Sequence, residues 1–176
     1  MILGETTRKP KLWSQPSTRS SSLAGDDLDV GVSELTDDSG QRFLVVDSDA
    51  FVHLSRGKAR AAVLAPYVEG RRVVLSFATV AEIRRGAYRL GYNEESWRRL
   101  EADIAATVVA APTNALSHEW ARLTNQARNM GHALGQAAQA HDAWVAATGR
   151  YYSLAILTDD SDFEGFPELM LLPPRA

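Results

Sequence analysis

The sequence predicts one α/β domain with a parallel sheet of about five strands, preceded by a flexible N-terminal extension. Short apolar runs alternate with segments of helical periodicity from residue 43 onward. These runs contain few polar residues, which is typical of strands that are buried on both faces of a parallel sheet. Large apolar residues are scarce before Phe43. We therefore expect an extension over residues 1–42 and a folded domain over residues 43–176.

The expected extension is rich in Ser, Thr, Asp and Gly and shows no sustained helix or strand period. Its first half is basic, and its second half carries six acidic residues between Asp26 and Asp38. A segment of this composition is expected to lack a fixed structure of its own. The alternative is an arm that binds a partner.

The first half of the domain contains two predicted strands, each followed by helical sequence. The continuous apolar run at 43–46 ends at an aspartate, as expected for a buried strand, and the residues at 52–54 and 59–68 have helical character. The run RVVLSF at 72–77 predicts a second strand, and a helix is predicted over 79–90.

The second half of the domain continues the alternation of helices and strands. Trp97, Leu100 and Ile104 fall on one face at helical spacing, and the last predicted helix is rich in alanine. The predicted helices cover 94–106, 115–129 and 136–150, and the predicted strands cover 107–110, 154–157 and 169–172.

The composition excludes several classes of protein. None of the 176 residues is cysteine, which excludes disulfide scaffolds, thiolate catalysis and zinc sites with cysteine ligands. No apolar run approaches the roughly 18 residues of a membrane-spanning helix, and no secretory signal is evident. We expect a cytoplasmic protein with no membrane association.

Acidic residues gather where the predicted strands end. Asp47 follows the first strand, Glu82 follows the second, Asp160 follows the fourth, and Asp142 lies one turn into the preceding helix. The carboxyl ends of the strands form the ligand site in open α/β sheets. Clustered carboxylates repel one another unless a cation neutralises them, and all-oxygen ligands suit Mg²⁺ or Mn²⁺. This pattern predicts metal-assisted hydrolysis of phosphodiester bonds.

Several acids near the strand ends also have a purely structural explanation. Asp49 is a candidate helix cap, and Glu82 is a candidate capping-box partner of Thr79. Asp160 and its acidic neighbours are candidate turn formers. Asp142 is harder to explain in this way, because it begins an apolar helical stretch where a buried acid needs a partner or a chemical role.

Four segments follow the order and approximate spacing of PIN-domain ribonucleases, namely LVVDSDAFVHL, TVAEIRRGAY, HDAWVAAT and LTDDSDFEGF. Over about residues 43–172 the chain resembles the VapC-type toxins of bacterial type II toxin–antitoxin systems. The resemblance implies a PIN-like three-layer α/β/α fold, an acidic site for Mg²⁺ or Mn²⁺, and cleavage of RNA. It also implies a homodimer and a small antitoxin partner that places a segment, often with a basic residue, in the acidic cleft. The helices around 94–104 and 52–67 are the two candidates for the groove that receives it.

Site residues follow from the resemblance motif by motif. Asp162 would be an accessory acid, and the Ser48 hydroxyl would orient Asp47. Glu82 would bind the metal or orient the attacking water. The catalytic acids would be Asp47, Glu82, Asp142 and Asp160, with Asp47, Asp142 and Asp160 as the metal ligands. The chain departs from the family pattern in its long extension and in Asp49. It also has Asp159 beside Asp160, and the spacing to the following Asp-Phe pair favours Asp160 as the aspartate that faces the metal.

The charge of the domain permits binding of RNA. Residues 43–176 carry 14 basic and 15 acidic side chains, and 10 acidic side chains remain when the five proposed site acids are set aside. Phosphate contacts supply most of the affinity for nucleic acids. Arg84 and Arg85 flank the site helix and are candidate RNA contacts, with a solvated helix face as the alternative.

Other functions remain open at this point. The Asp47-x-Asp49 pair also suggests a haloacid-dehalogenase-type phosphatase, but no lysine follows Lys58, and that assignment leaves Glu82 without a role. A PIN-domain nuclease of RNA maturation and a catalytically silent binding module are further alternatives.

Overall fold

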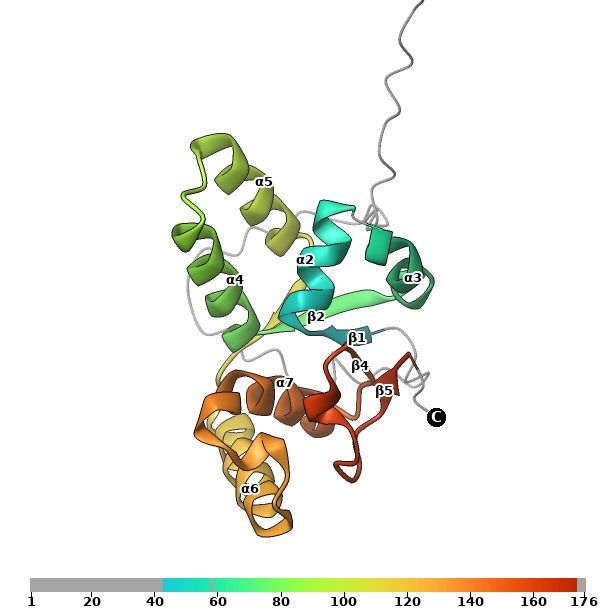
Figure 1. Ribbon diagram of the computed structural model, residues 1–176, viewed down its shortest axis with the longest axis vertical. Helices are drawn as coiled ribbons and strands as arrows, with labels where there is room; N and C mark the ends of the chain where they lie inside the picture. Colours follow the sequence, from blue (N-terminus) through green and yellow to red (C-terminus); the bar gives the residue numbers. More distant parts are fainter. Residues whose placement is uncertain (1–42, 58, 174–176) are drawn as a thin grey trace, which may run out of the picture.

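The computed structural model describes residues 43–57 and 59–173 (Figure 1). The predicted extension over 1–42 lies outside the described residues. The described chain forms a parallel sheet with the strand order β3-β2-β1-β4-β5. The strands are β1 (Phe43–Val46), β2 (Arg72–Ser76), β3 (Val108–Ala110), β4 (Ile156–Leu157) and β5 (Leu171–Leu172). The predicted five-stranded parallel sheet is therefore confirmed.

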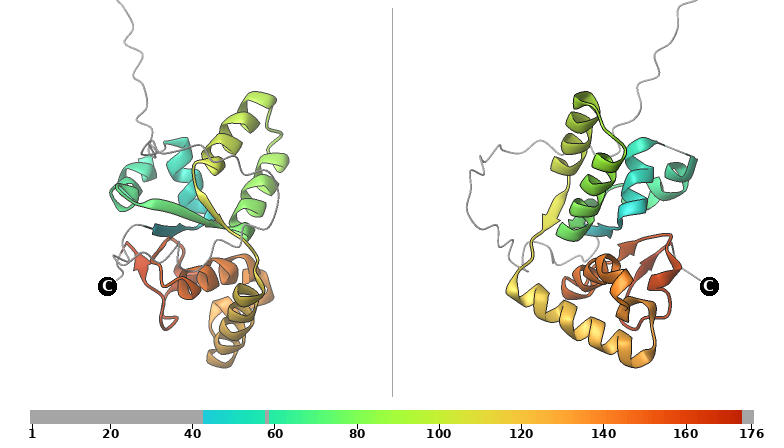
Figure 2. Two further views of the ribbon diagram at one scale, coloured as in Figure 1. Left: turned by 180° about the vertical axis from the view of Figure 1, so that it is seen from behind. Right: turned by 60° about the vertical axis from the view of Figure 1, so that its left-hand side comes forward.

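Helices cover both faces of this sheet, so that the domain has three layers (Figures 1 and 2). Helices α6 and α7 lie on one side, and α2, α3, α4 and α5 lie on the other. The helices are α2 (Ser48–Arg56), α3 (Ala59–Val68), α4 (Phe77–Arg89), α5 (Glu94–Ala105), α6 (Asn114–Met130) and α7 (Ala140–Tyr151). No helix in the described part of the chain combines the length and apolar character needed to cross a membrane.

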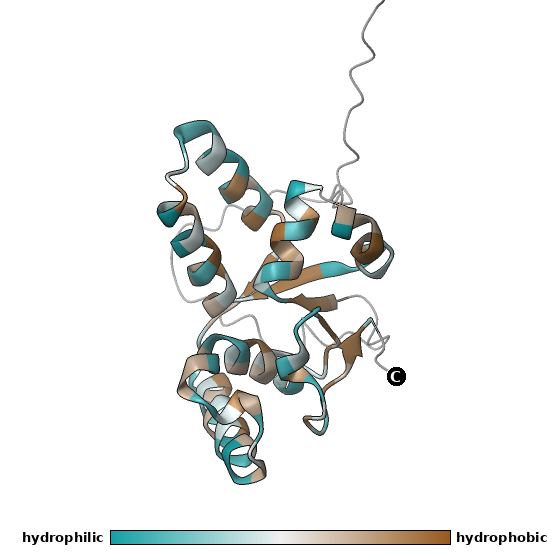
Figure 3. Ribbon diagram, in the orientation of Figure 1, coloured by the Kyte–Doolittle hydropathy of each residue, from teal (hydrophilic) through white to brown (hydrophobic). Residues whose placement is uncertain are grey.

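The first strand shows how the sequence builds the two apolar layers. Val45 belongs to the cluster on the α6 and α7 side, whereas Leu44 and Val46 belong to the cluster on the α2 and α3 side. Successive side chains of a strand point to opposite faces, so a continuous apolar run can fill both layers. Figure 3 shows the hydrophobic strands between helices whose outer surfaces are more hydrophilic.

The strand register determines where the carboxyl ends lie. Val46 is paired with Leu157, and the backbone N–H of Asp47 donates to the Leu157 carbonyl at 3.2 Å. Asp47 and Thr158 consequently follow two adjacent strands at the same edge of the sheet. This edge carries the candidate functional site.

The segment before α7 differs from the prediction of one helix over 136–150. It forms two 3-10 turns, η1 (Ala133–Gly135) and η2 (Ala137–Gln139), and the helix begins only at Ala140. Gln136 has extended backbone angles, which interrupts any continuous helix. Gly135 packs so closely against the end of α6 that an added Cβ would lie 2.5 Å from the Arg128 nitrogen. The shift places Asp142 in the first turn of α7.

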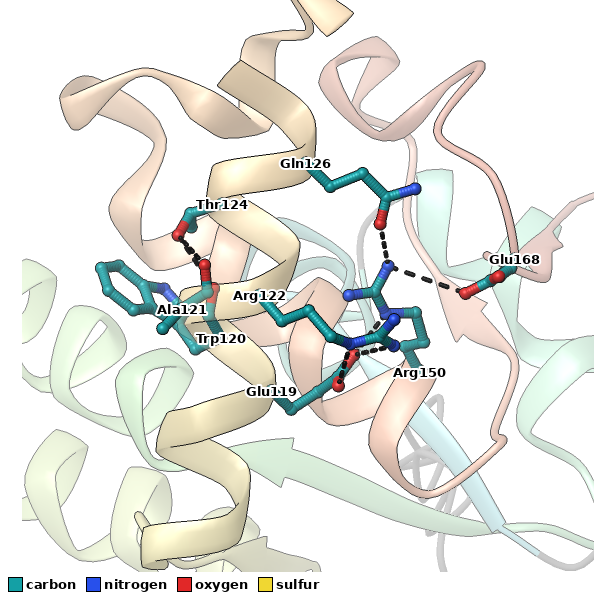
Figure 4. A network of polar contacts seen from close by, with 8 residues as sticks. All are labelled: Glu119, Trp120, Ala121, Arg122, Thr124, Gln126, Arg150 and Glu168. Atoms are coloured by element: carbon teal, nitrogen blue, oxygen red, sulfur yellow. Dashed lines mark hydrogen bonds and ion pairs between the residues drawn. The ribbon is translucent and has the colours of Figure 1, made fainter. Parts of the chain in front are cut away.

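A buried arginine fixes the far end of α7 (Figure 4). Arg150, with a side chain only 5% exposed, forms an ion pair with Glu119 of α6 and donates to Gln126 at 2.9 Å. Its Nη1 lies 3.7 Å from Glu168 in the loop before β5. Burial alone would raise the pKa of Glu119, but Arg122 and Arg150 lower it below its usual value. The network anchors the helix whose other end carries Asp142.

Two helical glycines provide a matched test of this packing. A Cβ at Gly149 would lie 2.6 Å from Cγ1 of the buried Ile156, whereas a Cβ at Gly86 would meet nothing within 4 Å. We expect Gly149→Ala to destabilise the domain by about 1–3 kcal/mol through overpacking. Gly86→Ala is expected to stabilise it by about 0.5–1 kcal/mol. Urea unfolding of both variants measures the difference, and equal midpoints would contradict the packing of α7 on β4.

Candidate functional site

Five acidic side chains converge on the carboxyl edge of the sheet from four elements. Asp47 ends β1 and is the N-cap of α2, and Glu82 lies on α4. Asp142 lies in the first turn of α7, and the turn after β4 carries Asp160 and Asp162. Sequence positions up to 115 residues apart are thereby brought to one edge.

Three of these acids form the most compact group. Carboxylate oxygens of Asp142, Asp160 and Asp162 all lie within 4.8 Å of one another. The pKa of Asp142 is raised to about 7, first by burial and then by the charges of Asp160, Glu82, Asp47 and Asp162 in that order. The five acids therefore lie close enough for their negative charges to repel one another.

Asp47 is the most buried of the five acids, with a relative exposure of 5%. Its Oδ1 accepts the backbone N–H of Ala50 at 2.7 Å, and its Oδ2 accepts the hydroxyl of Thr158. Burial raises the pKa of Asp47 to about 6 even though these two hydrogen bonds lower it. The N-cap of α2 is thus Asp47, and the expectation that Asp49 caps this helix is wrong.

The adjacent aspartates after β4 point in different directions. Asp159 forms a two-pronged ion pair with Arg60 of α3, with 2.6 Å between Nε and Oδ2. Asp160 accepts the backbone N–H of Asp162 at 2.8 Å and caps the short helix η3 (Ser161–Phe163). Asp160 therefore belongs to the acidic group, as spacing predicts, and it also has the turn-forming role considered as its alternative.

Glu82 is held from two sides. The Ser48 hydroxyl donates to Oε2 of Glu82 at 2.9 Å, and Arg85 lies 3.2 Å from Oε1. The expectation that Ser48 orients Asp47 is therefore corrected, because Ser48 begins α2 and its side chain reaches across to α4.

The capping-box explanation of Glu82 is wrong. Helix α4 begins at Phe77, and the Ser76 hydroxyl caps it by accepting the N–H of Ala78. Thr79 consequently lies inside the helix and not at its N-cap. The Glu82 carboxylate therefore does not cap the start of α4.

The two candidate RNA contacts on α4 are both engaged within the protein. Arg84 donates to Glu101 of α5 through two nitrogens, at 2.9 and 2.7 Å, and this contact raises the arginine pKa. Arg85 pairs with Glu82. Arg84 therefore holds α4 to α5, while Arg85 stays close to the acidic group.

Sequence reasoning missed two residues that position the acids. Thr158 donates to Asp47 and accepts the backbone N–H of Asp160 at 3.0 Å, so one hydroxyl joins two acids. The side-chain amide of Gln139, just before α7, donates to Asp162. The position of Thr158 directly after the fourth predicted strand was the available signal, whereas nothing in the sequence singles out Gln139.

The donor set fits a hard divalent cation. All the candidate ligand atoms are carboxylate oxygens, the type that Mg²⁺ and Mn²⁺ prefer. Two of the acids, Asp47 and Asp142, have pKa values raised toward neutrality in the metal-free protein. A cation at this edge would relieve the repulsion that raises them.

The comparison with protein families decides the identity of the fold. The family model described as PIN domain matches residues 44–169. The chain belongs to the PIN-domain family. The family match therefore excludes the alternative of a haloacid-dehalogenase-type phosphatase.

Individual relatives agree with this assignment. The PIN-domain chain is 29% identical to "Ribonuclease VapC4" of Mycobacterium tuberculosis over 100 residues, which are 56% of this chain and 74% of the relative. Its fold resembles VapBC2 from Rickettsia felis bound to a promoter DNA fragment (TM-score 0.61, 14% identity) and VapBC-1 from nontypeable Haemophilus influenzae (TM-score 0.60, 22% identity). Each of these two structural matches covers 73% of this chain and 96% of the other.

The raised pKa values of the acids predict an unusual pH dependence of stability. Asp47 and Asp142 have folded-state pKa values of about 6 and about 7, whereas both groups titrate near 4 in an unfolded chain. Between about pH 4 and pH 7 these two aspartates hold more protons in the folded state than in the unfolded state. Their contribution to the stability of the metal-free protein therefore falls as the pH rises through this range. We expect a higher Tm at pH 5 than at pH 7.5 in EDTA, measured by circular dichroism. Addition of Mg²⁺ at pH 7.5 should recover the loss, and a Tm insensitive to both would contradict this electrostatic description.

Proposed function

We propose that this chain is a Mg²⁺- or Mn²⁺-dependent endoribonuclease that hydrolyses phosphodiester bonds of RNA and serves as the toxin of a type II toxin–antitoxin system. The observation that carries the proposal is the convergence of five acids at the carboxyl edge of a PIN-domain sheet. The names of the relatives, a VapC ribonuclease and VapBC assemblies, support the same activity.

The acids divide into ligands and orienting groups. Asp47, Asp142 and Asp160 would hold the cation directly or through water, with Asp162 as an accessory acid. A cation bound there would lower the pKa of the attacking water and offset negative charge on the scissile phosphate. Glu82 is fixed by Ser48 and would accept a hydrogen bond from that water.

The remaining polar groups keep the acids in place. Thr158 sets the separation of Asp47 and Asp160, and Gln139 holds Asp162 through a neutral amide. Neutral donors fix a carboxylate without supplying the positive charge that would compete with a cation. Orientation of ligands by such surrounding groups is a general property of metal sites.

The proposed toxin would act in the cytoplasm on RNA, as a homodimer and under the control of a cognate antitoxin. A basic residue of the antitoxin would enter the acidic site and compete with the cation. The completeness of the acid set argues against a catalytically silent binding module, since a module without activity has no need for five convergent carboxylates.

The neighbouring aspartates after β4 give a direct test of the ligand assignment. We expect Asp160→Asn to weaken Mn²⁺ binding and to lower RNA cleavage at least about 100-fold, the upper range for loss of a metal-orienting group. Asp159→Asn should change both by less than about threefold, because Asp159 faces Arg60. Calorimetry with Mn²⁺ and cleavage of single-stranded RNA measure the two effects. Equal losses in both variants, or a loss confined to Asp159→Asn, would overturn the assignment.

A further inference from the structure

A groove of about 1000 Å³ runs between α2, α4 and α5. One end lies at the candidate site, where it is lined by Ser48, Asp49 and Glu82. Figures 1 and 2 show α4 and α5 as a hairpin that projects from the sheet, with α2 beside it. The groove is lined by charged residues and by apolar ones, of which the large ones are Phe51, Val52, Ile83, Leu90 and Leu100. Leu90 is 60% exposed, so apolar surface remains open to a partner.

The opposite end of the groove is basic. Helices α2 and α4 both start at the carboxyl edge of the sheet, so their last turns, with Arg56 and Arg89, lie away from the acidic site. Both arginines are exposed and line the groove. Among residues 43–57 and 59–173, Arg56 donates to the hydroxyl of Tyr92, and neither arginine has a carboxylate partner within 4.0 Å. Asp103 also lines the groove and contacts Ser55, but it forms no ion pair with either arginine. The groove thus offers apolar side chains and two exposed arginines that form no ion pair in the described part of the chain.

The chain itself contains a segment of complementary chemistry. Residues 26–38, DDLDVGVSELTDD, carry six carboxylates, and no basic residue occurs between Arg19 and Arg42. Four apolar side chains are interspersed with these acids, at Leu28, Val30, Val32 and Leu35. We propose that residues 26–38 bind in the α2–α4–α5 groove of the same chain, with their acids on Arg56 and Arg89 and their apolar side chains on its wall.

The tether is long enough for this contact. Residue 38 precedes the start of β1 by five residues and residue 26 by seventeen, which corresponds to spans of up to about 17 and about 58 Å. Helix α4 has 13 residues and is about 20 Å long. The linker to residue 26 can therefore span more than the length of α4, and attachment to the same chain raises the effective concentration of the segment at the groove.

The docking itself requires only the groove and the segment, so it can be tested without any nuclease assay.

The lack of native cysteine makes a distance measurement direct. Spin labels are attached in the full chain at Val30→Cys and at Ala102→Cys, a groove residue, and the distance distribution is measured by double electron–electron resonance. A second pair, Val30→Cys with Ala121→Cys on α6, serves as a control on the other side of the sheet. We expect a narrow short-distance peak for the groove pair and a longer distance for the control pair.

Charge variants identify the contacts responsible. Arg56→Glu combined with Arg89→Glu should reduce the short-distance population at least about fivefold, as expected for two lost ion pairs. Asp27→Asn with Asp29→Asn should reduce it in the same direction, and circular dichroism verifies that every variant is folded. A broad distribution in the parent chain, or a short peak that survives both sets of substitutions, would overturn the proposal. A short peak that disappears on dilution with unlabelled chain would assign the groove to a second copy and would also overturn it.

Discussion

Replacement of Asp142 by asparagine is expected to abolish metal-dependent RNA cleavage and to raise the stability of the metal-free protein. Asp142 lies in the centre of the acidic group, where burial and four neighbouring carboxylates raise its pKa to about 7. The asparagine keeps the shape of the side chain but removes one negative charge, so the repulsion falls and cation binding weakens. A loss of activity that is accompanied by a gain in Tm distinguishes a ligand from a residue that only supports the fold.

The measurement combines three readouts on the same preparations. Cleavage of single-stranded RNA should fall at least about 100-fold, Mn²⁺ affinity should fall about 10–100-fold, and the Tm in EDTA at pH 7.5 should rise. Glu69→Gln, an exposed acid after α3, serves as the matched control and should change none of the three. Full cleavage by Asp142→Asn would place the site elsewhere, and a lower Tm would contradict the repulsion described for the metal-free state.

Removal of the Thr158 hydroxyl should produce the second largest effect. Thr158→Val preserves the shape of the side chain, yet it removes the hydroxyl that donates to Oδ2 of the buried Asp47 and accepts the Asp160 N–H. Loss of a hydrogen bond to a buried carboxylate oxygen costs about 1–3 kcal/mol. We expect a loss of stability in that range and a 10–100-fold loss of cleavage, since both candidate ligands lose their orientation.

Thr158→Ser is the matched variant for this experiment. It retains the hydroxyl and should preserve most of the activity, although it creates a small cavity in a fully buried position. Urea unfolding and cleavage rates, measured for both variants, separate the two contributions. If the serine variant lost as much activity as the valine variant, packing and not hydrogen bonding would explain the role of Thr158.

Much of the fold could be predicted from the sequence because both faces of its central strands are buried. The run Phe43–Val46 is apolar at every position, and the structure confirms the strand at these bounds. The helix predicted over 136–150 was too long because the break depends on tertiary packing. Gly135 must approach the backbone of α6, and no local propensity indicates that contact.

The candidate site was predicted as a set of acids, but not the contacts among them. Position after a strand identifies Asp47 and Asp160, because the carboxyl edge of a parallel sheet gathers such positions. Asp142 is identified by the apolar helical stretch that it begins. The direction of Asp159 depends on Arg60, which lies 99 residues earlier in the chain. The partner of Ser48 likewise depends on how α2 packs beside α4. Contacts of this range require the three-dimensional arrangement of the helices.

We propose that this PIN-domain chain uses a divalent cation to cleave RNA. The most direct test incubates the purified full chain, separated from any antitoxin, with single-stranded and structured RNA in Mg²⁺, in Mn²⁺ and in EDTA. We predict cleavage with either metal, none in EDTA, and recovery when excess Mg²⁺ is added back. Cleavage that persists in EDTA, or no cleavage of any RNA by a protein that circular dichroism shows to be folded, would contradict the claim.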